Sequence, residues 1–147
     1  SLGGHDGSNR VNNIQYITIS TLGNASDFGD LAATRTPNAG AMSNAIRGLA
    51  FGGGAPGPVA GNSNTIEFIT IATLGNGTDF GDLLGTRGDG AGFSSPTRAV
   101  CALGSGSSDT TVEYVQIMST GNAVDYGDLN QGTYEFGGNS NGHGGLG

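Results

Sequence analysis

One pattern recurs three times along this 147-residue chain, and its spacing limits the folds that the chain can adopt. The pattern is a short segment of alternating apolar residues, then Gly-Asn, two variable residues and Asp-(Phe or Tyr)-Gly-Asp-Leu. The copies occupy residues 14–31, 66–83 and 112–129, so they begin 52 and 46 residues apart. A period near fifty residues is typical of arrays in which each unit packs on its neighbours. We therefore expect three related units in one array.

The composition predicts that these units are built from strands. Thirty of the 147 residues are glycine and only 12% are charged. Glycine weakens a helix interior by about 1 kcal/mol relative to alanine, which excludes a helical bundle. Glycine does not fall at every third position, which excludes collagen. Regular clusters of Val, Ile, Phe and Tyr argue against disorder, so the expected fold class is all-β.

Each unit is expected to form a sheet of four short antiparallel strands. The first strand is placed near residues 39–43, the second at 48–51, the third at 14–20 and the fourth at 28–33, with equivalents in the other repeats. The rings of Phe28, Phe80 and Tyr126 are expected to be buried between sheets. A hairpin turn between the third and fourth strands is assigned to the glycine-asparagine pairs. These are Gly23-Asn24, Gly75-Asn76 and Gly121-Asn122.

The repeats divide the chain into one array rather than separate domains. Repeat 1 covers about residues 10–61, repeat 2 about 62–107 and repeat 3 about 108–147, and residues 1–9 resemble the end of a preceding unit. Residues 140–147 resemble the start of a further unit, so the two ends joined would complete one more second strand. Two interpretations stay open: the ends meet and close a ring, or the chain is an excerpt of a longer array.

Charge and hydropathy exclude some classes of partner. The formal net charge is −7 and the chain has no lysine, whereas nucleic-acid binding needs a basic patch. An anionic membrane surface is disfavoured for the same reason. The apolar runs are far shorter than a membrane-spanning helix requires. Cys101, flanked by apolar residues, is interpreted as a small buried hydrophobic side chain rather than a nucleophile.

The triplicated carboxylates are the only candidates for a metal site. Together with the nearby asparagines they could supply oxygen ligands to Ca²⁺, although they lack the dense acidic run of dedicated calcium loops. The candidates are Asp27, Asp30, Asp79, Asp82, Asp125 and Asp128.

A structural interpretation of these pairs is favoured over the calcium site. In it, the first aspartate caps its own turn and the second pairs with an arginine. The candidate partners are Arg35, Arg47, Arg87 and Arg98, and Thr133 stands in repeat 3 where the first arginine would be. No Ser-His-Asp set or metal cluster supports catalysis, so no enzyme activity and no cofactor other than Ca²⁺ are considered.

The repeat resembles the Kelch-like repeats of bacteriophage tail-fibre and other virion structural proteins. The resemblance rests on Arg-Gly, apolar residues and Gly-Gly at 47–53, on residues 66–71, and above all on Gly-Asn-x-x-Asp-Phe-Gly-Asp-Leu. It implies four-stranded blades of a β-propeller, although the chain has no tryptophan, which Kelch repeats usually contain. The structural repeat positions are Gly23, Asn24, Phe28, Gly75, Asn76, Phe80, Gly121, Asn122, Tyr126, Arg47 and Arg98.

Three blades are too few for a closed propeller, which typically needs roughly four to eight. Oligomerisation or flanking sequence would have to supply the others. The alternative architecture is a β-trefoil or β-prism with threefold internal symmetry, which would imply a lectin-like carbohydrate-binding module. The resemblance implies a non-enzymatic virion component, in a tail fibre or surface appendage, that mediates assembly or host contact. Its expected partners are other virion chains, copies of itself or a host-surface glycan, without nucleic acid and without membrane insertion.

Overall fold

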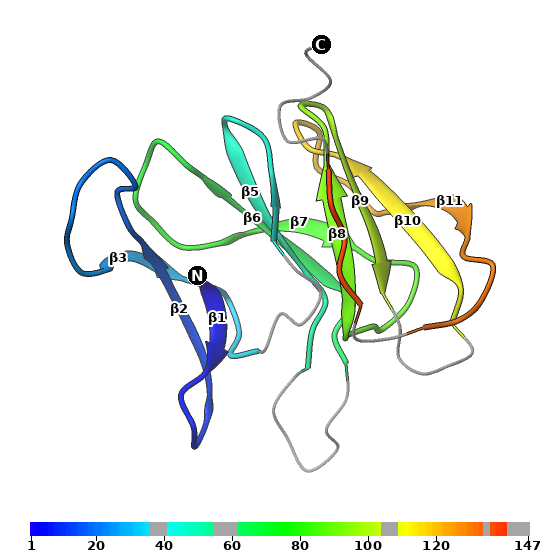
Figure 1. Cartoon of the computed structure of the whole chain (residues 1–147), viewed down its shortest axis with the longest axis horizontal. Coiled ribbons are helices and arrows are strands. Elements are labelled where there is room, and N and C mark those ends of the chain that lie inside the picture. The colour runs from blue at the N-terminus through cyan, green and yellow to red at the C-terminus, as the bar shows by residue number, and fades with distance from the viewer. Residues whose placement is uncertain (36–40, 55–61, 104–108, 134–135, 141–147) are drawn as a thin grey trace.

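The computed structural model describes residues 1–35, 41–54, 62–103, 109–133 and 136–140. Within these ranges the regular secondary structure consists of eleven β-strands, and there is no helix. The strands form three antiparallel sheets that follow one another along the chain (Figure 1). The prediction of an all-β fold is confirmed. The described residues include no helix of the length and hydropathy that a membrane crossing requires.

The N-terminal sheet contains three strands, β1 (Leu2–His5), β2 (Arg10–Tyr16) and β3 (Ser26–Asp30), in that order. We expected the third strand of the repeat to reach residue 20 and the fourth to run from 28 to 33. Both strands instead end earlier, at Tyr16 and Asp30. Among the described residues, this sheet has no counterpart of the first strand that the other two sheets have.

The middle sheet has the four strands that the repeat predicts. It is ordered β4 (Ala41–Ser43), β5 (Arg47–Phe51), β6 (Thr65–Thr70) and β7 (Thr78–Asp82). Residues 39 and 40, where the first strand was expected to begin, lie outside the described residues.

The C-terminal sheet has the same plan. Its strands are β8 (Gly90–Ser94), β9 (Arg98–Leu103), β10 (Thr111–Gln116) and β11 (Val124–Asp128), each paired with the next. β8 lies next to β4 of the middle sheet, where the Ser94 hydroxyl donates to the Ser43 carbonyl oxygen at 2.7 Å. The first strands of successive sheets therefore lie side by side.

The Asp-(Phe or Tyr)-Gly motif forms a β-bulge in every sheet. In the N-terminal sheet Ile14 pairs with Gly29 and Gln15 with Asp27, which leaves Phe28 as the extra residue on its strand. The same shift occurs in the other two sheets. A bulge of this kind needs a residue with a positive φ, a backbone conformation that glycine adopts without steric cost. Gly29 supplies it with a φ of +149°.

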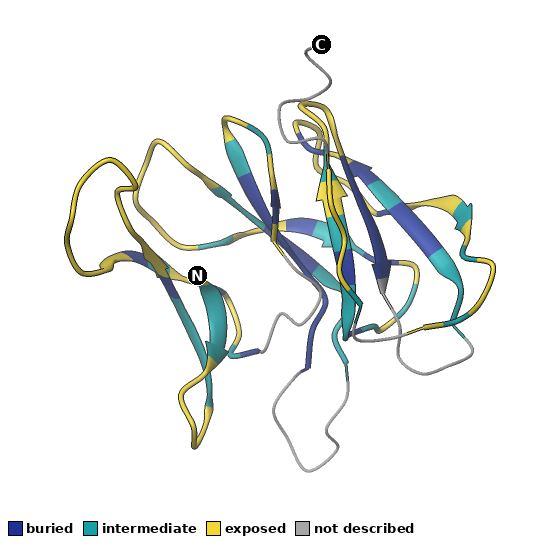
Figure 2. Cartoon of the chain, in the orientation of Figure 1, coloured by how far each residue is buried: buried dark blue, intermediate teal, exposed yellow. Residues whose placement is uncertain are grey.

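The apolar core lies between successive sheets, where the buried segments of the strands face one another (Figure 2). Phe28 packs in a cluster with residues of the middle sheet, and Phe80 packs in a cluster with residues of the C-terminal sheet. The prediction of buried rings is confirmed for these two positions. It is wrong for Tyr126, which is 58% exposed because no described sheet follows the C-terminal one. Cys101 is buried, as expected, and burial raises its pKa to about 12.

Candidate functional site

The glycine-asparagine pairs do not form the hairpin turn that the sequence suggested. The turn after β6 comes earlier, where the Thr73 amide donates to the Thr70 carbonyl oxygen at 3.1 Å. The following segment, which contains Gly75 and Asn76, crosses to the preceding sheet instead. Two such crossings occur in the described chain, and we call each one a junction between sheets.

At the first junction, the segment 75–77 adds a further row of hydrogen bonds to the outer edge of β3. Gly75 N–H donates to the Phe28 carbonyl oxygen at 2.8 Å, and Gly77 N–H donates to that of Asp30 at 2.7 Å. The Asp30 amide in turn donates to Oδ1 of Asn76 at 3.0 Å. An edge strand leaves unpaired backbone groups, and this segment satisfies them.

The second junction repeats this geometry on β7. Gly121 N–H donates to the Phe80 carbonyl oxygen and Ala123 N–H to that of Asp82, both at 2.8 Å. The Asp82 amide donates to Oδ1 of Asn122 at 3.1 Å. The repeated motif therefore has two matching parts: its Gly-Asn segment binds the preceding sheet, and its fourth strand receives the next one.

The bulge glycines allow the close approach at each junction. A Cβ atom built on Gly29 would lie 2.3 Å from the carbonyl oxygen of Gly75, and one on Gly81 would lie 2.4 Å from that of Gly121. Real Cβ atoms do not come so close to backbone oxygens, so a side chain at either position would push the two sheets apart.

A buried ion pair crosses the first junction. Arg35, which follows the N-terminal sheet, contacts Glu67 on β6, and both side chains are buried. Glu67 also accepts the backbone N–H of Ala32 at 2.7 Å, and Arg35 donates to the Thr65 carbonyl oxygen at 3.0 Å. Burial lowers the pKa of Arg35, and the charge of Glu67 opposes that shift.

The second junction contains the equivalent pair. Glu113 accepts the Leu84 N–H at 2.8 Å, and its other carboxylate oxygen lies 3.2 Å from Nε of Arg87. Arg87 also pairs with Asp109. Burial raises the pKa of Glu113, partly offset by the Leu84 N–H and by Arg87.

The expectation that an arginine pairs with the second aspartate of each motif is wrong. Arg35 pairs with Glu67, and Arg87 pairs with Glu113 and Asp109 instead. The glutamates were visible in the sequence as Ile-Glu-Phe and Val-Glu-Tyr, at one position of the repeat. Their arginine partners come from the preceding repeat, and for that reason a search within one unit missed them.

Arg47 and Arg98 lie over aromatic rings. The guanidinium carbon of Arg47 is 4.3 Å from the Phe68 ring centre, and that of Arg98 is 4.9 Å from the Tyr114 ring centre. Such cation–π contacts are typical of arginine beside an aromatic face. Arg47 also crosses to the next sheet, where it donates to the carbonyl oxygen of Ile117 at 3.0 Å.

The two aspartates of the third motif make structural contacts. Asp125 accepts the Gly127 N–H at 3.0 Å, which is the self-capping turn expected of the first aspartate. Asp128 accepts the hydroxyl of Thr110 at 2.9 Å. Across the ranges that the structure describes, no three His, Cys, Asp or Glu side chains gather in a way that would hold a metal ion.

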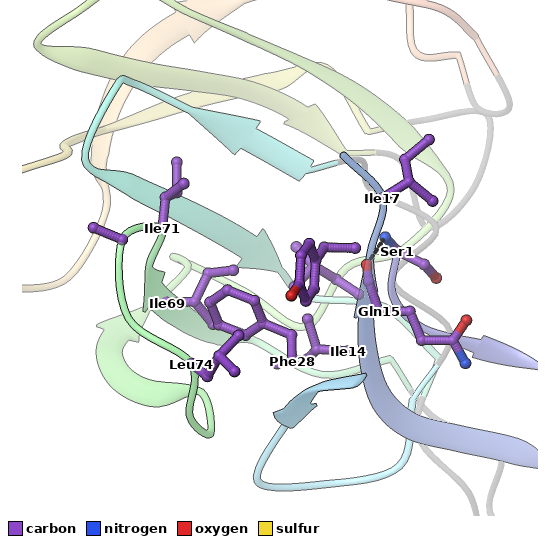
Figure 3. Close-up of a pocket in the computed structure, with 11 residues that line it drawn as sticks. Ser1, Ile14, Gln15, Ile17, Phe28, Ile69, Ile71 and Leu74 are labelled. Atoms are coloured by element: carbon purple, nitrogen blue, oxygen red, sulfur yellow. Dashed lines mark hydrogen bonds between the residues drawn. The ribbon is translucent and has the colours of Figure 1, made fainter. Parts of the chain in front are cut away.

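A cavity of about 520 Å³ opens between the N-terminal and middle sheets (Figure 3). Its apolar walls include Ile14, Phe28, Ile69, Ile71 and Leu74. Between the middle and C-terminal sheets, the corresponding space is filled by Met42 and Leu49, which belong to the first two strands of the middle sheet. In the N-terminal sheet Ser1 pairs with Gln15, so no described residue stands where Leu49 stands in the middle sheet.

No protein-family model and no curated protein matches this chain.

Proposed function

We propose that each sheet is one blade of a propeller-like array, and that the chain is a non-enzymatic structural or adhesion component of a phage virion. The arrangement of the first strands supports the blade interpretation, because β4 and β8 lie side by side as inner strands of neighbouring blades do. Two of the core clusters contain residues from two successive sheets. This packing favours blades over a trefoil or a prism closed within one chain.

One observation carries the functional proposal: much of the repeated motif is used to join one sheet to the next. The glycine-asparagine pair covers an edge, the bulge glycine permits close approach, and the Arg–Glu pair crosses the buried face. Residues kept for a ligand would instead converge on an open cleft. A motif used in this way suits an extended array in a tail fibre or surface appendage, where assembly or host contact is the task.

Immunogold electron microscopy tests the proposal. Antibody raised against the 147-residue chain would be applied to purified particles released by the cells that encode it, with antibody pre-absorbed on the chain as the control. We expect gold on the tail fibre or another surface appendage. Chain found only in the soluble fraction, with particles free of label, would contradict a virion role.

A glycan array distinguishes the lectin-like alternative. Label on the particle together with glycan binding would assign the chain to host-surface contact. Glycan binding by a chain that is absent from particles would favour an independent carbohydrate-binding module.

A further inference from the structure

A junction needs the outer edge of a fourth strand and a Gly-Asn segment that covers it. Among the described residues, the C-terminal sheet has such an edge without a covering segment, and the N-terminal sheet has such a segment without an edge to cover. In the C-terminal sheet, β11 has the position of β3 and β7, yet no segment covers its outer edge in the described chain. A Cβ atom on Gly127 would meet nothing within 4 Å, unlike those on Gly29 and Gly81. In the N-terminal sheet, residues 23–25 correspond to 75–77 and 121–123. Ala25 is exposed, whereas its counterpart Ala123 is buried against the middle sheet.

The apolar surfaces of the two ends also match. Ile117 is fully buried against the middle sheet, whereas its counterpart Ile19 is 95% exposed. At the other end Tyr126 is exposed, whereas its counterpart Phe80 is 2% exposed beneath the C-terminal sheet. Contiguous exposed apolar groups mark interaction surfaces.

The ends of the array have neutral residues at both positions where the internal junctions have a charged pair. Gln15 occupies the position of Glu67 and Glu113, opposite the first aspartate of the motif. Thr133 occupies the position of Arg87, 46 residues further along the chain, and is exposed. An arginine or a glutamate alone would be buried without a counter-ion at such a junction, at a high cost. Replacement of both charges leaves a neutral pair that can be buried.

Arg98 continues the same correspondence. Its counterpart Arg47 donates to the Ile117 carbonyl oxygen across the second junction. Arg98 is exposed, and the residue that corresponds to Ile117 in the N-terminal sheet is Ile19. A junction of the same geometry between the two ends would bring the Arg98 guanidinium to the carbonyl oxygen of Ile19.

We propose that a second copy of this chain docks head to tail, with the C-terminal sheet of one copy against the N-terminal sheet of the other through a third junction of the same geometry. A head-to-tail contact closes into a ring when the rotation per unit permits it. Two copies of the three described sheets would make a ring of six, within the range of roughly four to eight blades that closed propellers contain.

Residues 136–140 support the closure. They run along β8 at the edge of the C-terminal sheet (Figure 1), and a Cβ atom on Gly138 would lie 3.1 Å from that of Ala91. β8 itself lies along β4 in the same manner. The segment therefore takes the place of the first strand of the next sheet. In the dimer the next sheet is the N-terminal sheet of the second copy, which has no first strand among the described residues and has the cavity between itself and the middle sheet.

The mass of the purified 147-residue chain tests the proposal, measured by light scattering after size exclusion from micromolar to millimolar concentration. We expect a dimer of twice 14.5 kDa in equilibrium with monomer. Asn24→Ala removes one hydrogen bond from each of the two new junctions and should raise the dissociation constant at least tenfold. Gly127→Ala should abolish the dimer, because its new Cβ would meet the carbonyl oxygen of Gly23.

Two controls separate association from folding. Asn76→Ala, at the same place in an internal junction, should lower thermal stability and leave the dissociation constant within twofold. A mixture of the Ala25→Cys and Asp128→Cys chains should form a mixed disulfide, because their counterparts Ala123 and Asp82 are hydrogen-bonded at 2.8 Å. A monomer at every concentration would overturn the proposal, as would a dimer that Asn24→Ala and Gly127→Ala leave intact. Open polymers would overturn the two-copy ring. The virion proposal does not depend on this outcome.

Discussion

The Arg35–Glu67 pair provides the sharpest test of how the sheets are joined. Glu67→Gln keeps the shape of the side chain and an oxygen that can accept the Ala32 N–H, but it removes the negative charge beside Arg35. Arg35 is 3% exposed and Glu67 2% exposed, so water cannot replace the lost carboxylate. The variant therefore tests the charge pair itself rather than packing.

The expected cost follows from what Arg35 retains. Removal of one partner of a buried ion pair typically costs about 3–5 kcal/mol, because the remaining charge is left uncompensated. Arg35 keeps its hydrogen bonds to the carbonyl oxygens of Gly52 and Thr65, at 3.3 and 3.0 Å. We therefore expect the lower end of that range, about 3 kcal/mol, which for a chain of this length lowers the melting temperature by roughly 6–12 °C.

The double variant Arg35→Met/Glu67→Gln completes the measurement. Replacement of a buried ion pair by neutral side chains of similar volume is often neutral or stabilising, so the double variant should lie within about 1 kcal/mol of the wild type. The single variant Arg35→Met leaves Glu67 uncompensated and should also cost about 3 kcal/mol, so the cycle gives a coupling energy of about 5–7 kcal/mol between the two residues. Urea denaturation followed by circular dichroism and by tyrosine fluorescence measures both quantities, and coincident curves check that unfolding is two-state.

A cost below about 1 kcal/mol for Glu67→Gln, with no coupling in the double variant, would refute the reasoning. That result would place the pair in water. The first junction would then depend on its backbone hydrogen bonds alone.

Three further results are expected. Phe80→Ala should cost about 3–5 kcal/mol in urea denaturation because its ring is buried between sheets, whereas Tyr126→Ala should cost less than about 1 kcal/mol in the dilute monomer. Cys101, buried and with its pKa raised to about 12, should react with a thiol reagent at neutral pH only as fast as the chain unfolds, so a rapid native reaction would contradict its burial. Burial raises the pKa of Glu113 above its ordinary value of 4.5. The stability that comes from the protonated carboxyl group is therefore fully present below pH 4.5. That contribution is lost as the pH rises through the raised pKa. Wild type should therefore lose stability relative to Glu113→Gln over that interval, and parallel urea midpoints would argue against the shift.

Local pattern was sufficient to predict the strands. The glycine content excluded helices, and the alternation of apolar residues located most of the strands to within a few residues of their observed positions. The burial of Cys101 followed from its apolar neighbours in the sequence. The strand pattern depends on contacts within one unit, where sequence spacing and spatial distance are closely related.

The junctions were decided by the tertiary structure. The Gly75-Asn76 pair has the composition of a hairpin turn, and nothing within its own repeat distinguishes a turn from a segment that hydrogen-bonds to Phe28 and Asp30 of the repeat before it. Arg35 and Glu67 lie 32 residues apart, and each has nearer opposite charges along the chain.

Tyr126 also shows that contacts between sheets cannot be predicted from the motif. Its motif matches those of Phe28 and Phe80, but its ring is exposed because burial depends on a neighbouring sheet rather than on the motif. The sequence by itself determined the all-β class, the three units and the strand pattern, since those follow from local conformational preference. Which groups meet between units was decided only when the sheets packed, because a repeated motif presents the same residues whether or not a neighbour is there to cover them.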